Sequence, residues 1–268
     1  MKKLFWTGTA LAILGFATIS VLAQNQTKTI RGESGLLFGA RVTSWVKLNA
    51  QKVVEVGMTL PLKSIENAPL PAPNDTNNMA GMSMGPTLRL ELPSVVKDTT
   101  FLDHIDLYWE AFGHSPARFI TPHFDIHFFG ISSANTDKID CKNLTPPDLK
   151  LTPAGFAPAV PPGVDPATMC VPNMGFHGLS LAEFTSPGQL KPGLFDYTVV
   201  TGFYDNKFIF TEPMISKAFL LKKQSFGSVI SRPAIVGRNT LYPTQFNLRF
   251  DSQKNVFQLI YSNFEMGQ

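Results

Sequence analysis

The chain has 268 residues, with 23 basic and 20 acidic side chains and a formal net charge of +3. This near balance argues against a protein that holds nucleic acid mainly by charge, because such proteins carry a clear surplus of Lys and Arg. The length suits one large β domain or two small ones, and we expect a single β-rich domain over residues 24–268.

The N-terminus has the pattern of a secretory signal peptide over residues 1–23. Lys2 and Lys3 precede an almost unbroken apolar run, and small or apolar residues lead up to Ala23. We expect cleavage after Ala23 and export to the periplasm or the outside, with no membrane span in the mature chain. The alternative is an anchor that stays, since residues 4–23 have about the length of a short spanning helix.

Alternation with a period of two, which is typical of strands, begins at residues 41–48 and continues at 53–60. The second segment puts four apolar side chains on one face: Val54, Val56, Met58 and Leu60. The four residues "NAQK" between the segments predict a hairpin.

Residues 64–86 form a polar loop rich in Pro and Gly that contains Met79, Met82 and Met84. Thioether ligands select Cu(I), so a periplasmic copper-binding protein is one hypothesis. The alternative is a loop or contact patch without metal, because no His or Cys lies in this segment.

Two further strands are predicted at residues 87–92 and 104–110. The second has an apolar face of Ile105, Leu107 and Trp109, and a polar face of His104, Asp106, Tyr108 and Glu110.

The segment "TPHFDIHFFG", residues 121–130, reads as a strand with two different faces. Phe124, Ile126 and Phe128 point one way, whereas His123, Asp125 and His127 point the other. Residues two apart on a strand have Cα atoms about 6.6 Å apart and could share one ion. His123 and His127 would be about 13 Å apart, so we do not expect these two to share an ion on a regular strand.

A complete site therefore needs ligands from other segments. The candidates are His114, His177 and Glu212, and His104 on the preceding strand. Three histidines and a carboxylate on a β scaffold are a common way to hold one Zn²⁺, Mn²⁺ or Fe²⁺ ion. The alternative is a buried hydrogen-bonded His–Asp–His network without metal, because polar groups are costly to bury unless they have partners.

The two cysteines, Cys141 and Cys170, lie at the ends of the Pro-rich segment 144–172. An even pair in an exported protein predicts one disulfide, which would pin this loop. The alternative is two free thiols.

The C-terminal half repeats the hairpin pattern. Residues 197–204 and 207–212 flank the turn-prone pair Asp205-Asn206, and residues 244–250 and 256–264 flank "DSQKN". Helical signals are confined to a turn near 179–184 and a short segment near 215–222. Many short antiparallel strands with long loops predict an all-β sandwich or flattened barrel.

We find no sequence motif that identifies a particular reaction. The sequence has no Gly-x-Ser-x-Gly nucleophile motif. We therefore expect an exported β-domain protein that acts by binding or assembly, and a metal-dependent hydrolase or lyase is the alternative.

Several segments together resemble a family of exported bacterial proteins with a domain of unknown function. They are "GARVTSWVKLNAQKVVEVGMTL", "PHFDIHFF", "CVPNMGFHG", "GFYDNKFIFTEPMISKAFL" and "YPTQFNLRFD". The resemblance implies a β-rich fold, a homo-oligomer that could be ring-like, and no established reaction. The polar positions that it implies are shared are His114, His123, Asp125, His127, His177 and Glu212. His104, the Met-rich loop and the cysteines lie outside that pattern.

Overall fold

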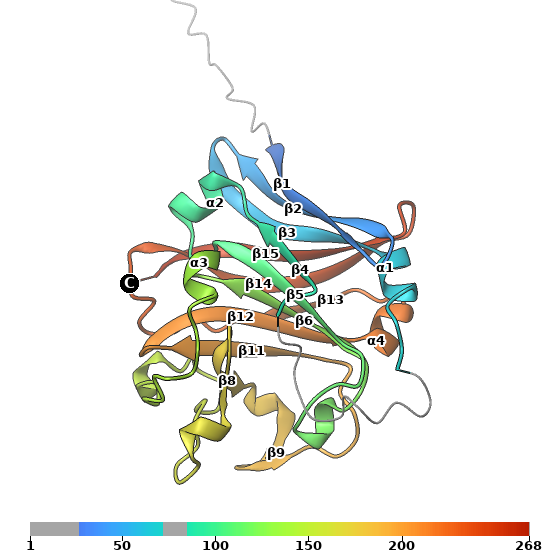
Figure 1. The fold of residues 1–268 in the computed structure, drawn as a ribbon. Coiled ribbons are helices and arrows are strands. Elements are labelled where there is room, and N and C mark those ends of the chain that lie inside the picture. Colours follow the sequence, from blue (N-terminus) through green and yellow to red (C-terminus); the bar gives the residue numbers. More distant parts are fainter. Residues whose placement is uncertain (1–26, 72–84, 268) are drawn as a thin grey trace, which may run out of the picture.

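Two antiparallel sheets make up most of the structure, a computed structural model that describes residues 27–71 and 85–267 (Figure 1). The first sheet has six strands in the order β1-β2-β3-β15-β14-β13. The second has seven in the order β4-β5-β6-β12-β11-β8-β7 and curls into a half-barrel. The prediction of an all-β protein with little helix is confirmed.

The first sheet consists of β1 (Thr27–Leu37), β2 (Ala40–Asn49), β3 (Lys52–Pro61), β13 (Phe226–Val229), β14 (Thr240–Asp251) and β15 (Val256–Gly267). The second consists of β4 (Leu88–Glu91), β5 (His104–Glu110), β6 (His123–Phe129), β7 (Cys170–Val171), β8 (Gly175–Leu179), β11 (Tyr197–Tyr204) and β12 (Lys207–Ser216). A small pair comprises β9 (Phe184–Ser186) and β10 (Gln189–Leu190). The helices are α1 (Leu62–Glu66), α2 (Ser94–Thr99), α3 (Ser133–Thr136) and α4 (Lys217–Leu221), with 3-10 turns at Ala117–Phe119, Leu149–Leu151, Pro166–Thr168 and Leu181–Glu183.

The predicted hairpins form with tight turns. Ala50 and Gln51 join β2 to β3, and Asp205 and Asn206 join β11 to β12; all four have positive φ. This backbone twist matches the right-handed twist of the paired strands. The short helix α4 and the 3-10 turn at Leu181–Glu183 lie within the two predicted helical segments.

One predicted face needs correction. The pairing of β2 with β3 shifts between Lys47 and Leu48, so that Val53 rather than Val54 turns into the core. A bulge of this kind moves the alternation by one residue, which the period-two pattern alone does not reveal. The alternation from Val56 to Leu60 agrees with the prediction.

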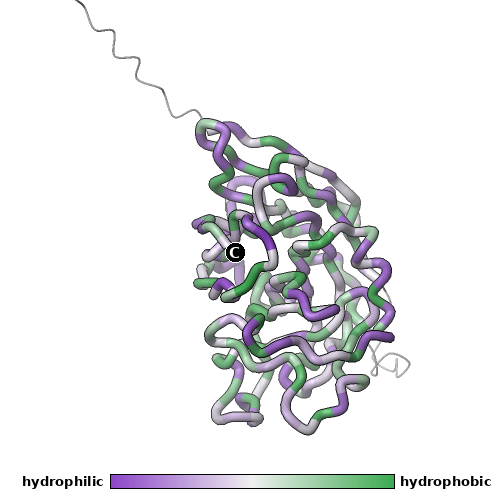
Figure 2. The backbone as a smooth tube through the Cα atoms, turned by 90° about the vertical axis from the view of Figure 1, so that its left-hand side faces the viewer, coloured by the Kyte–Doolittle hydropathy of each residue, from purple (hydrophilic) through white to green (hydrophobic). Residues whose placement is uncertain are grey.

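The main apolar core lies between the two sheets. Val46, Val56 and Leu259 contribute from the first sheet, while Ile126 and Phe128 contribute from the second. Hydrophobic and hydrophilic stretches follow one another along the chain (Figure 2). The buried hydrophobic side chains of the two sheets form this core. The face of the second sheet that points away from this core is the polar face.

The predicted disulfide is present between Cys141 and Cys170, which are 29 residues apart. Cys170 lies on the edge strand β7, opposite Phe176 of β8, so the bond ties the Pro-rich loop to the second sheet. By the chain-entropy model, closing a loop of this length contributes about 3–4 kcal/mol of stability.

The predicted signal peptide and the three methionines of the Met-rich loop lie outside the described residues. Among the residues that the structure describes, no helix is long and apolar enough to span a membrane.

Gly202 of β11 provides a test of the curled sheet. A Cβ atom at this position would lie 1.9 Å from the Phe210 ring. We expect Gly202→Ala to lower the free energy of unfolding by about 1–3 kcal/mol, the usual cost of overpacking. Chemical denaturation measures it, with Gly85→Ala as control, because a Cβ at Gly85 meets no atom within 4 Å. Equal stability of the two variants would contradict the packing described.

Candidate metal centres

The polar face of the second sheet carries a continuous field of buried charged and hydrogen-bonding side chains. β5 contributes His104, Asp106, Tyr108 and Glu110, β6 contributes His123, Asp125 and His127, and β12 contributes Glu212, all of them buried. Two small apolar clusters enclose this field, one around Phe119 and Phe195 and the other around Phe129 and Phe210. The predicted opposite faces of β6 are therefore present, and both are buried.

The curl of the sheet concentrates these groups. His127 on β6 and His177 on β8 lie three strand spacings apart, which is about 14 Å across a flat sheet. Their ring centroids are 5.9 Å apart. The sheet must therefore bend toward its polar face, so that side chains from distant strands converge there.

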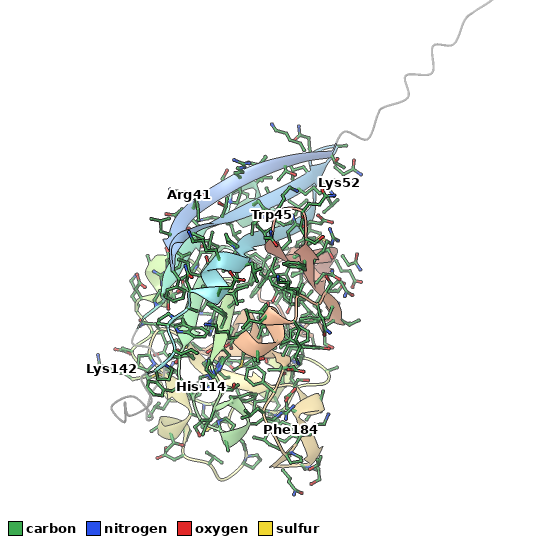
Figure 3. The ribbon with its side chains drawn as sticks, turned by 90° about the vertical axis from the view of Figure 1, so that its right-hand side faces the viewer. Arg41, Trp45, Lys52, His114, Lys142 and Phe184 are labelled. Carbon is green, nitrogen blue, oxygen red and sulfur yellow. A yellow bond between two sulfur atoms is a disulfide. The ribbon has the colours of Figure 1, made fainter. Side chains whose placement is uncertain are left out.

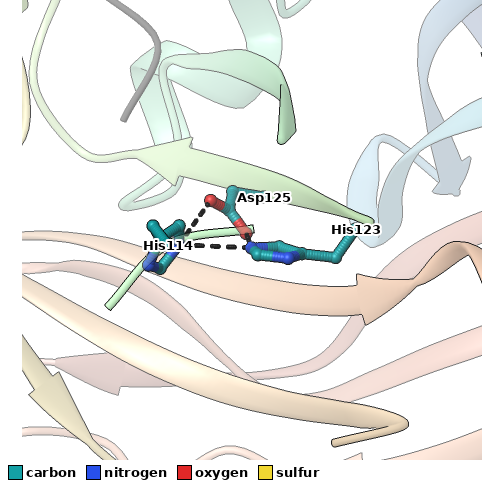
Figure 4. Close-up of side chains that lie close together, drawn as sticks. All are labelled: His114, His123 and Asp125. Atoms are coloured by element: carbon teal, nitrogen blue, oxygen red, sulfur yellow. Dashed lines mark hydrogen bonds and ion pairs between the residues drawn. The ribbon is translucent and has the colours of Figure 1, made fainter. Parts of the chain in front are cut away.

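The first group of converging side chains is His114, His123 and Asp125, called group A (Figure 4). The Nε2 atoms of the two histidines are 3.2 Å apart. Asp125 Oδ2 lies 3.2 Å from His114 Nε2, and Asp125 Oδ1 lies 2.9 Å from His123 Nε2. His114 comes from the loop after β5, where a turn folds back against Phe119.

Backbone carbonyls fix the tautomers of both rings. His123 Nδ1 lies 2.6 Å from the Thr121 oxygen, and His114 Nδ1 lies 2.8 Å from the Ser115 oxygen. A carbonyl oxygen only accepts, so each Nδ1 carries a proton and each neutral ring presents a bare Nε2 lone pair. Two lone pairs and a carboxylate then point at one another, which is unfavourable without a cation or an added proton between them.

A proton is one way to satisfy group A. Burial opposes a charged His114, but the hydrogen bond and charge of Asp125 outweigh it and raise the pKa of His114 to about 9. Burial alone would raise the pKa of Asp125, yet the two histidines hold it well below its ordinary value. Asp125 Oδ1 nevertheless has no partner with hydrogen-bond geometry among the described residues, despite its short distance to His123.

The second group, called group B, is His127, His177 and Glu212. Glu212 Oε2 lies 3.6 Å from His127 Nε2 and 3.9 Å from His177 Nε2. These separations are too long for hydrogen bonds. Four buried atoms of the group lack a hydrogen-bond partner within the described ranges: both ring nitrogens of His127, Nε2 of His177 and Oε2 of Glu212.

Burial also shifts the pKa values of group B. It lowers the pKa of His127 to about 4 and that of His177 to about 3, so both rings are neutral near pH 7. Burial, followed by the charges of Asp125 and Glu110, raises the pKa of Glu212 well above its ordinary value. Two neutral imidazoles and a carboxylate that resists ionisation form a donor set that a bound cation would stabilise.

His104 belongs to a different, satisfied network. Its Nδ1 lies 3.3 Å from Asp103 Oδ1 and its Nε2 lies 3.5 Å from Thr136 Oγ1, both within hydrogen-bond distance, and Nε2 also lies 3.8 Å from Asp106 Oδ1. Asp106 also accepts two bonds of 2.7 Å from the Arg89 guanidinium. His104 is thus a buried histidine with partners, consistent with its place outside the resemblance.

The structure divides the six predicted site residues between two groups. His123 and His127 fall in different groups, in line with their spacing on the strand. Tyr108 was not predicted as a site residue, although it lies opposite Asp125 and its buried hydroxyl has no hydrogen-bond partner in the described part of the chain. The sequence feature that could have identified Tyr108 is its position on the polar face of β5, between Asp106 and Glu110. Met79, Met82 and Met84 lie outside the described residues.

Comparison with known proteins gives one limited similarity. Residues 50–109 match the TTHB210-like family, which is described as "Hypothetical protein TTHB210". The matched segment runs from the β2–β3 turn to β5 and includes no member of group A or group B. No curated protein and no solved structure matches the chain. The similarity therefore supports an uncharacterised family and assigns no activity.

The pKa shifts predict that metal-free protein is most stable near pH 6.5. Below about pH 6.5 the unfolded chain takes up two protons, at His127 and His177, that the folded protein does not bind. The folded protein binds one proton that the unfolded chain lacks, at Glu212, because the pKa of Glu212 is raised. The net difference is therefore one proton. Stability should therefore fall by about 1.4 kcal/mol per pH unit toward pH 4.5. Above pH 6.5 it should fall again, because Glu212 and His114 hold protons that the unfolded chain releases.

Urea denaturation of chelator-treated protein at a series of pH values measures this profile. A flat profile between about pH 5 and 9 would show that the two groups do not carry these shifts.

Proposed function

We propose that this chain is an exported metal-binding protein that holds two divalent ions of the Zn²⁺, Mn²⁺ or Fe²⁺ class, one in group A and one in group B. The observation that carries the proposal is the convergence of bare His114 and His123 Nε2 atoms on the Asp125 carboxylate, with both Nδ1 atoms turned to backbone carbonyls. In metal sites, a ligating histidine characteristically donates its other N–H to a carbonyl or carboxylate.

The dimensions of group A favour a metal over a proton. Ligands bound tetrahedrally at about 2.0–2.1 Å lie about 3.3 Å from one another. In group A the two Nε2 atoms are 3.2 Å apart, and each lies close to one Asp125 oxygen: His114 is 3.2 Å from Oδ2 and His123 is 2.9 Å from Oδ1. A single proton satisfies one of these pairs and leaves the others facing each other.

Group B supports a second ion through its unpartnered atoms. Leaving a buried donor or acceptor unsatisfied costs about 1–3 kcal/mol, and four such atoms lie together here. An ion bound by His127, His177 and Glu212 would satisfy three of them at once. Two imidazoles and one carboxylate suit Zn²⁺, Mn²⁺ and Fe²⁺ better than Cu(I), which prefers thiolates and thioethers.

The number of buried carboxylates on the polar face also supports bound metal ions. Asp106, Glu110, Asp125 and Glu212 are four buried carboxylates, and Arg89 is bound to the first of them. Buried carboxylates require positive partners, protons or metal ions. Divalent ions in groups A and B would supply positive charge at Asp125 and Glu212.

Burial favours binding over catalysis. In group A the side chains are 0 to 8% exposed, and in group B they are 1 to 14% exposed. A catalytic metal keeps an open position that substrate reaches, and ligands that are mostly buried disfavour the hydrolase or lyase alternative. Export fits the disulfide, and a homo-oligomer remains a prediction.

The test is metal analysis of protein purified without a His tag. We expect about two equivalents of transition metal in the wild type and about one in each of His123→Gln and Glu212→Gln. His104→Gln is the matched control, because His104 is equally buried but lies in the Arg89 network, and it should keep both ions. Less than about a tenth of an equivalent in the wild type would falsify the proposal.

Stability separates loss of metal from loss of fold. Glu212→Gln removes a carboxylate that burial and like charges destabilise, so the metal-free variant should be at least as stable as metal-free wild type. Adding metal at about a thousand times its dissociation constant should stabilise the wild type by about 4 kcal/mol per site, and this variant should lose one site's share.

A further inference from the structure

The outer face of the first sheet has a strongly cationic groove that is separate from groups A and B. The groove has a volume of about 660 Å³ and crosses five strands, from β1 to β14. Five basic side chains and one acidic side chain line it: Arg31, Arg41, Lys47, Arg249, Lys254 and Glu55. This surplus contrasts with the near balance of the whole chain.

The arginines of the groove are available to a ligand. Lys47 pairs with Glu55, and Lys254 pairs with Asp251. Arg31, Arg41 and Arg249 are exposed and make no ion pair with any described residue. Unpaired guanidinium groups bind carboxylate or sulfate groups through two parallel hydrogen bonds.

The register of the strands gives the groove a defined layout. Thr43, Thr59 and Gln258 form a row across β2, β3 and β15, and Arg249 continues it on β14. Arg31 and Lys47 flank the row on one side, and Arg41 and Lys254 flank it on the other. The result is a polar floor of hydroxyl and amide groups between two sets of cations. The row from Thr43 to Arg249 is about 14 Å long at the usual strand spacing, and the whole groove from β1 to β14 is about 19 Å long.

One aromatic side chain, Trp45, lines the groove, and its indole N–H already donates a hydrogen bond within the protein. Trp45 lies on the same strand as Arg41 (Figure 3), is 8% exposed, and donates from Nε1 to Thr59 Oγ1 at 3.1 Å. A Cβ at Gly57, opposite Trp45, would lie 3.1 Å from the indole ring. The absence of a side chain there gives the ring room to lie low in the sheet.

We propose that this groove binds an extended acidic polysaccharide that bears carboxylate or sulfate groups. Its acidic groups would pair with Arg31, Arg41 and Arg249, and its hydroxyl groups would exchange hydrogen bonds with Thr43, Thr59 and Gln258. Single-stranded nucleic acid fits less well, because such binders stack bases on exposed aromatic rings and Trp45 offers almost none of its surface. This site is independent of metal binding.

The test measures binding of the full chain to fluorescently labelled heparin and polygalacturonate. Neutral dextran, oligothymidylate and anionic phospholipid vesicles are the comparison probes. We expect both acidic polysaccharides to bind and dextran not to bind. Raising the salt from about 50 to about 200 mM should weaken binding roughly tenfold or more, because several charge contacts release counterions.

The variant Arg41→Glu with Arg249→Glu should weaken polysaccharide binding at least roughly tenfold, while the control Lys138→Glu with Lys150→Glu should change it less than about twofold. The control makes the same change in net charge at exposed positions outside the groove. All four positions are exposed, so the variants should fold, and circular dichroism checks this. The proposal is overturned by no binding of either polysaccharide, equal losses in both variants, or tighter binding of oligothymidylate or vesicles.

Discussion

The constraint on which the rest of the structure depends is the burial of charge on one face of a sheet. Four carboxylates and five histidines lie on or beside the polar face of the second sheet, most of them fully buried. Such groups are tolerated only with partners. Two hydrogen bonds from Arg89 satisfy Asp106 in one part of the face. Groups A and B, built around Asp125 and Glu212, contain atoms whose partners are not protein atoms in the described residues. The metal ions that we propose for groups A and B would supply the missing partners for Asp125 and Glu212.

The curvature of the second sheet and the alternation of its strands determine where the buried charged groups lie. Alternation on β6 sends Phe124, Ile126 and Phe128 into the main core and frees the opposite row for polar groups. Curling brings His177 of β8 toward His127 and Glu212. The Phe210 ring, which lies over Gly202, contacts both histidine rings from the side. The Cys141–Cys170 bond ties the Pro-rich loop to the strand beside β8. The outer face of the first sheet is exposed to solvent and does not bury charge in this way. Three arginines on it, Arg31, Arg41 and Arg249, make no ion pair with any described residue.

Much of the fold follows from local pattern. The alternation in 104–110 and 197–204 predicts β5 and β11 at their observed bounds, and the turn pair Asp205-Asn206 predicts the β11–β12 hairpin. The predicted second strand, 207–212, is shorter than β12, which continues to Ser216. β1 was missed, because "TKTIRGESGLL" has no clean alternation and its pairing with β2 shifts between Arg31 and Ser34. The choice of the six candidate residues follows from chemistry and resemblance, and all six lie in the two groups that could hold an ion. Their division into two groups does not follow from these, because it depends on which strands neighbour one another and on how strongly the sheet curls. Strand spacing could exclude only a shared ion for His123 and His127.

Crystals of the untagged protein, measured at the absorption edge of the metal that it contains, test the central claim most directly. The account predicts two anomalous peaks. One should lie within about 2.0–2.2 Å of His114 Nε2, His123 Nε2 and Asp125, and the other at the same distance from His127, His177 and Glu212. Peaks elsewhere, or ordinary density for waters at both positions with no anomalous signal, would contradict it.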